Sequence, residues 1–236
     1  MFMKRKGFFI IALLTLSMSV TGQKYEPTTI WPYLYKDFQK GTIYFKTGDP
    51  IEKNVNIHLV ESVLHYVENN VIYELNNPES VDIIEVETPS GQEDFVYIGN
   101  KVYRAITQGE NGSGVYELNK GNFVELLTTT GAFGTKNYAT ASTRLSSLTF
   151  GGINWDYAKL KLTSEQDPGQ SFPINKTYFF IINGNFVKAR SKDLENAIVS
   201  PQVKKQMKEY VKKNKVKWNN PDSLANLFRF LQTTQS

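Results

Sequence analysis

Cysteine is absent from this 236-residue chain, and histidine occurs only twice, as His58 and His65. Without cysteine the chain forms no disulfide, no Cys-ligated zinc or iron–sulfur site and no thiol nucleophile. Phosphate-binding and dinucleotide-binding glycine motifs are also missing, and Gly112-Ser113-Gly114 lacks the following helix of a nucleophile elbow. The sequence therefore predicts no cofactor and favours a protein that is not an enzyme.

The first 22 residues have the parts of a secretory signal peptide. Lys4–Lys6 form a positive region, Phe8–Leu16 form an apolar run too short to span a membrane, and cleavage is expected after Gly22. A lipoprotein anchor would need a cysteine just after the apolar run. We therefore expect an exported protein of the periplasm or cell surface that is not lipid-anchored.

The positive charge of the chain is concentrated at its two ends. Removing the three cations of residues 1–22 from the 27 of the whole chain leaves 24, against 23 anions. Residues 23–187 carry a net charge of −6 and residues 188–236 a net charge of +7. A mature chain so close to neutral argues against nucleic acid as the partner, and the character of the sequence changes near residue 188.

Residues 41–127 predict an antiparallel β domain. The expected strands are short segments rich in β-branched and aromatic residues, separated by turn residues. They are 42–46, 55–60, 63–68, 71–75, 81–87, 94–98, 102–106, 115–118 and 123–127. No stretch of ten residues within this region has helical periodicity, so we expect a β-meander.

Two less regular segments flank parts of this β domain. Residues 23–40 combine aromatic residues with prolines and predict an extended lead-in that packs over the edge of a sheet. Residues 128–175 are rich in threonine, serine and glycine and predict a loop or linker. Within that linker, alternating apolar residues predict one strand at 158–162.

Residues 176–236 predict a β-hairpin followed by helices. Asn183-Gly184 is a strong hairpin signal. Helices are then expected to start at Ser191, at Ser200-Pro201 and at Asn220-Pro221. The fold class is thus mainly β (α+β overall), with an antiparallel meander forming a twisted sheet or partial barrel and two to three C-terminal helices.

Two turns predict the register of the first hairpins. A turn centred on Glu61-Ser62 places Leu59 opposite Leu64, and a turn centred on Asn69-Asn70 places Leu64 opposite Leu75. The two registers agree on one apolar face. We therefore expect these three leucines to form a buried row.

The same registers align His58, His65 and Glu74 on the opposite face. Cβ atoms of directly opposite residues are about 4.5–5.5 Å apart, close enough for two imidazoles and a carboxylate to share a divalent metal ion. These residues are the candidate metal ligands, and a metal-dependent hydrolase is the enzyme alternative. The other interpretation is a polar row on a solvated face, with Glu74 hydrogen-bonded to His65.

A basic surface is predicted on the first long C-terminal helix. Its lysines lie opposite an apolar stripe that contains Met207. Such a face is either the solvated side of a docked helix or a weak contact with an anionic membrane surface. The lysines are Lys204, Lys205, Lys208, Lys212 and Lys213.

Several runs resemble a family of uncharacterised secreted Bacteroidetes-type envelope proteins. They are residues 41–46, 55–66, 101–106, 115–118, 183–186 and 210–215, and the similarity covers most of 38–127 and 176–231. The resemblance implies a location in the cell envelope and a fold in which a β-sheet is followed by helices. It implies no activity. We expect an exported, non-enzymatic binding or structural protein whose partner is an envelope protein or a glycan. The alternatives are the hydrolase and a membrane-peripheral protein.

Overall fold

The computed structural model describes residues 33–122, 128–130, 136–138, 149–150, 153–154 and 173–235. The signal peptide, the strands expected at 123–127 and 158–162, and most of the linker lie outside the described residues.

Ten strands form one antiparallel sheet, and three helices follow it. The strands are β1 (Gln39–Phe45), β2 (Ile51–His58), β3 (Val63–Glu68), β4 (Val71–Glu74), β5 (Val81–Thr88), β6 (Gly91–Ile98), β7 (Lys101–Gln108), β8 (Gly114–Gly121), β13 (Ile174–Ile182) and β14 (Asn185–Lys188). The helices are α3 (Ser191–Ala197), α4 (Pro201–Asn214) and α5 (Pro221–Gln235). Two separate pairs are β9 (Thr128–Thr130) with β10 (Lys136–Tyr138), and β11 (Thr149–Phe150) with β12 (Ile153–Asn154). The expectation of a mainly β protein with C-terminal helices is confirmed.

The sheet is open and has the order β14-β13-β8-β7-β6-β5-β1-β2-β3-β4. It is not one continuous meander, because β5 returns to pair with β1 instead of continuing from β4. The sheet thus consists of two meanders that meet at β1. Gly41 of β1 allows this close meeting, since a Cβ atom there would lie 2.6 Å from Val55 Cγ2 and 3.1 Å from the Glu85 carbonyl oxygen.

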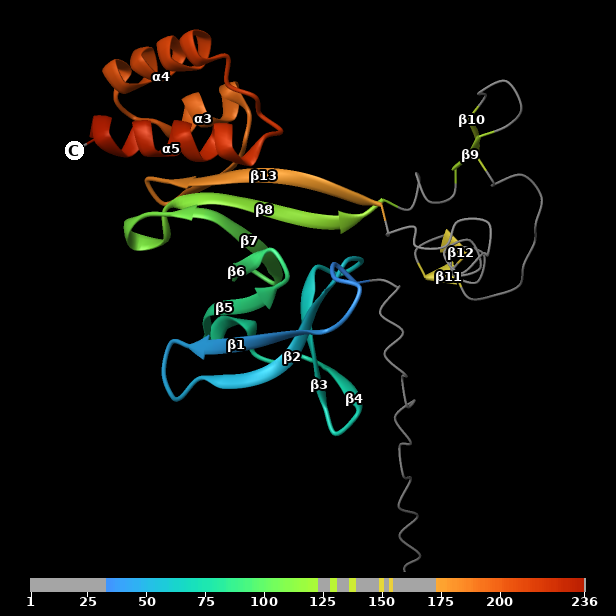
Figure 1. Cartoon of the computed structure of the whole chain (residues 1–236). Helices are drawn as coiled ribbons and strands as arrows, with labels where there is room; N and C mark the ends of the chain where they lie inside the picture. Colours follow the sequence, from blue (N-terminus) through green and yellow to red (C-terminus); the bar gives the residue numbers. More distant parts are fainter. Residues whose placement is uncertain are drawn as a thin grey trace, which may run out of the picture.

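The sheet curls until the turn after β2 reaches strands from the other meander (Figure 1). Val102 N donates to the Ser62 carbonyl at 2.7 Å, and Gly121 N donates to the Leu59 carbonyl at 3.0 Å. The curled face encloses an apolar core whose fully buried members come from both meanders. They include Ile43, Val55, Leu64, Ile84 and Val86.

The register predicted for β3 and β4 is confirmed, whereas the one predicted for β2 and β3 is wrong by two residues. His65 pairs with Glu74 as expected, but Leu64 pairs with Ile57. The cause is a longer turn: Ser62 N donates to the His58 carbonyl at 2.8 Å, so residues 59–62 all lie outside the strands. A shift of two keeps every side chain on its face, and the three leucines are buried as predicted.

The helices cover one face of the β8–β13 end of the sheet (Figure 1). The serine at 200 caps α4 by accepting from Val203 N at 3.4 Å, and Asn220 Oδ1 accepts from Ser223 N at the start of α5 at 2.8 Å. All three predicted helix starts are therefore found, although Ser191 is the first residue of α3 and Arg190 is its N-cap. Met207 of α4 and Phe228 of α5 are buried in one apolar cluster that also contains Phe180 and Ile182 of β13. None of the described helices is long and apolar enough to cross a membrane.

Leu64→Ala tests the curled core. Leu64 is fully buried, so we expect this substitution to lower the free energy of unfolding by about 2–5 kcal/mol, the cost of lost burial and a cavity. Val199→Ala is the control, because Val199 is 82% exposed and its truncation should cost less than about 0.5 kcal/mol. Urea unfolding measures both, and equal losses would contradict the core assignment.

Met207→Asp tests whether α4 is docked through its apolar stripe. Met207 has no exposed surface, so an unpaired carboxylate there should lower the free energy of unfolding by about 3 kcal/mol or more. Lys205→Asp on the exposed side of the same helix should change it by less than about 0.5 kcal/mol. Thermal unfolding of the two variants compares them, and a neutral Met207→Asp would mean that α4 does not pack on the sheet.

Candidate metal centre

The first described residues of the lead-in, 33–35, lie along β2 at the position where β1 has not yet begun. Tyr33 forms a bridge with His58, and Leu34 N donates to the Ile57 carbonyl at 3.0 Å. Beyond Leu34 the chain no longer pairs with β2, and the backbone of Tyr35 hydrogen-bonds to the buried side chain of Asn56 instead. Asn56 Oδ1 accepts from Tyr35 N at 3.1 Å, and its Nδ2 donates to the Tyr35 carbonyl at 2.9 Å. The lead-in is thereby fixed over the face that carries the histidines.

The two imidazoles lie together on this face, although they are not the direct pair that the sequence predicted. His58 pairs with Val63, and His65 pairs with Asn56. As diagonal neighbours the two histidine rings stack, with centroids 4.8 Å apart and planes 19° apart. Tyr33 meets both rings edge-on, and its hydroxyl lies 2.9 Å from His65 Nδ1.

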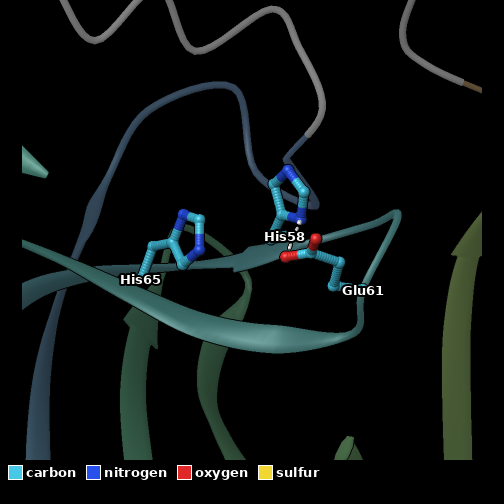
Figure 2. A group of neighbouring side chains, drawn as sticks. All are labelled: His58, Glu61 and His65. Atoms are coloured by element: carbon cyan, nitrogen blue, oxygen red, sulfur yellow. Dashed lines mark ion pairs between the residues drawn. The ribbon is translucent and has the colours of Figure 1, made fainter. Parts of the chain in front are cut away.

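The carboxylate that joins the imidazoles comes from the turn and not from β4. Ligand atoms of His58, Glu61 and His65 all lie within 4.8 Å of one another, and Glu61 Oε2 is 3.6 Å from His58 Nδ1 (Figure 2). Glu74 keeps its predicted place beside His65 in the ladder, but it is exposed and does not belong to this group. Neither Glu61 nor Tyr33 was predicted from the sequence as part of this group. The His-x-x-Glu spacing within a single turn is the signal that could have identified Glu61.

The turn that carries Glu61 is held from both sides. Its Leu59 and Ser62 carbonyls accept the hydrogen bonds from Gly121 and Val102. Ser62 has a φ of 61°, a left-handed conformation that a residue with a side chain adopts at some cost. The backbone around Glu61 is therefore fixed independently of any ligand, which is the preorganisation that a binding site requires.

Burial sets the protonation state of the two histidines. It lowers the pKa of His58 to about 4 and, together with the nearby His58, lowers the pKa of His65 to about 4, while Glu61 acts in the opposite direction on His65. Both rings are consequently neutral at physiological pH, which is the form that binds metals. His58 Nδ1 is buried and finds no hydrogen-bond partner within the described part of the chain.

The three side chains are near one another but are not yet arranged around an ion. Zinc binds nitrogen and carboxylate oxygen at about 2.0–2.2 Å in tetrahedral geometry, so its ligand atoms are about 3.5 Å apart. The observed separations extend to 4.8 Å, and the two rings are stacked, so binding requires the imidazoles to rotate out of their stack until both point a nitrogen at the ion. Tyr33 occupies Nδ1 of His65 and leaves Nε2 as the nitrogen available to a metal. The group can thus supply two imidazole nitrogens and one carboxylate oxygen.

Comparison of the chain with models of protein families, with curated proteins and with solved structures found no match. The family resemblance inferred from the sequence stays an expectation, and the chemistry of the site rests on its own geometry.

Acid should destabilise the folded protein through the two histidines. Between about pH 6.5 and about pH 4 the unfolded chain binds protons at these positions that the folded chain does not, so stability falls as the pH falls. Each histidine contributes up to about 1.4 kcal/mol per pH unit. Urea unfolding at several pH values should therefore show a flatter pH dependence for a His58→Gln/His65→Gln double variant than for the wild type. Parallel curves would show that the rings do not resist protonation.

Proposed function

We propose that this protein is an exported, non-enzymatic binding protein of the cell envelope that holds a divalent transition-metal ion between His58, Glu61 and His65. The observation that carries the proposal is the group of two imidazoles and one carboxylate, whose ligand atoms all lie within 4.8 Å of one another. Imidazole nitrogen suits zinc, copper and nickel, and carboxylate oxygen completes a mixed ligand set of the kind that zinc accepts.

The surroundings of the imidazoles support this proposal. Metal-binding histidines commonly hydrogen-bond through the second ring nitrogen, which fixes the tautomer and the orientation of the ring. Tyr33 provides that bond to His65, and its own position is fixed by the bridge to His58. Because Tyr33 is only 5% exposed, the imidazoles lie under a cover and not on an open sheet.

Binding without catalysis is favoured over the hydrolase alternative by the number of acidic groups. A zinc hydrolase with two histidine ligands uses one carboxylate as the third ligand and a further group as the general base. The group found here contains a single carboxylate, that of Glu61. Used as a ligand, it leaves no second carboxylate in the group to accept a proton from a metal-bound water.

Metal retention by the purified protein tests the proposal. We expect equilibrium dialysis against zinc at neutral pH, followed by elemental analysis, to find about one bound ion per chain. His58→Ala and His65→Ala should each abolish retention, because each removes a ligand nitrogen. Tyr33→Phe should weaken binding by about 10- to 100-fold, the usual effect of losing a group that orients a ligand.

Two carboxylate variants form the matched control. Glu61→Gln should reduce zinc affinity, whereas Glu74→Gln removes the same charge from the other side of His65 and should leave affinity unchanged. A wild-type chain that retains neither zinc, copper nor nickel would overturn the proposal. A loss with Glu74→Gln that equals the loss with Glu61→Gln would overturn the ligand set.

A further inference from the structure

A row of alternating charges crosses the sheet beside the core that the helices cover. Arg104 of β7 bonds to Glu93 of β6 at 2.9 Å and to Glu117 of β8 at 3.2 Å. Glu117 has a side chain only 1% exposed, and Lys176 Nζ of β13 lies 3.5 Å from its Oε1. The Tyr35 hydroxyl donates to Glu93 Oε2 at 2.7 Å at the far end of the row. The two acidic and two basic residues offset one another, so the row has no net charge.

The row ends at a hollow that carries additional positive charge. Beside Lys176, this hollow of about 350 Å³ is lined by Lys188, Arg190 and Trp218. Lys188 and Arg190 are exposed, and no ion pair joins either of them to an acidic group in the described ranges. Because Lys176 is already engaged with Glu117, these two residues supply two uncompensated cations at the rim.

An indole side chain forms part of the wall of the same hollow. Trp218 lies in the connection between α4 and α5, packs partly against the core beneath the helices and also lines the hollow. The adjoining Asn219 adds an amide that can donate and accept hydrogen bonds. A rigid aromatic surface, an amide and two free cations are the groups that recognise a sugar ring bearing a carboxylate. The aromatic face stacks on the C–H bonds of the ring, while arginine binds a carboxylate through two parallel hydrogen bonds.

We propose that this hollow binds an acidic oligosaccharide, with its carboxylates on Lys188 and Arg190 and one sugar ring on Trp218. A hollow of about 350 Å³ falls within the range of about 300–1,000 Å³ that is usual for small-ligand sites. The site shares no residue with the metal centre, so either proposal can fail without the other. Variants that lose zinc should retain the oligosaccharide.

Calorimetric titration with short oligogalacturonate tests this site, using the full chain. We expect the carboxylate form to bind, with an affinity that falls as salt is raised, and the methyl-ester form of the same oligomer not to bind. Arg190→Gln and Lys188→Gln should each weaken binding by about 10-fold, since each removes a charge-assisted hydrogen bond. Trp218→Phe keeps an aromatic ring in the core and should weaken binding less than Arg190→Gln does.

Lys212→Gln is the control, because it removes the same charge from an exposed position of α4 that does not line the hollow. It should leave the affinity unchanged. Equal binding of the ester and the acid, an equal loss with Lys212→Gln, or no binding of the acid would each overturn the proposal. Binding to anionic phosphatidylglycerol vesicles that depends on Arg190 and Lys188, in the absence of oligosaccharide binding, would assign the hollow to lipid headgroups and overturn it as well.

Discussion

The backbone hydrogen bonds between the β2–β3 turn and the strands β7 and β8 are the constraint on which the rest of the molecule depends. They join parts of the sheet that are separated by several strands, and so hold the curl that encloses the first apolar core. They also satisfy carbonyl groups of Leu59 and Ser62, both of which are fully buried. The same turn carries Glu61 to the imidazoles, so the stability of the curl and the geometry of the candidate metal centre depend on one short segment.

A polar band separates the two large cores of the sheet. On one side lies the core enclosed by the curl, and on the other lies the core beneath α4 and α5. The ion pairs between Arg104 and the carboxylates of Glu93 and Glu117 lie between them. Buried ion pairs of this kind contribute little net stability because of their desolvation cost, but breaking one leaves an unpaired buried charge. The band therefore fixes how β6, β7 and β8 align more than it stabilises them.

Turn chemistry explains which registers could be predicted from the sequence. The hairpins at Asn69-Asn70 and Asn183-Gly184 use residues that tolerate the left-handed conformation, and all four have positive φ values. The register at Asn69-Asn70 was predicted correctly, and a hairpin forms at Asn183-Gly184 as expected. The turn at residues 59–62 places a serine in that conformation, and serine gives no such signal. The pairing of β5 with β1 could not be predicted either, because a strand that returns to pair with an earlier one leaves no local pattern in the sequence.

The periodicity of a strand explains why the sequence brought the two histidines together and missed the neighbouring carboxylate. A register error of two residues leaves His58 and His65 on the same face, since side chains alternate with a period of two. It changes only their relation, from directly opposite to diagonal, and the rings still stack at 4.8 Å. Leu59 and Val60, which were expected in the strand, lie in the turn, and this longer turn brings Glu61 next to His58. A carboxylate delivered by a turn has no strand alternation to reveal it, whereas one on a strand, such as Glu74, can be found from the pattern even when it stays exposed.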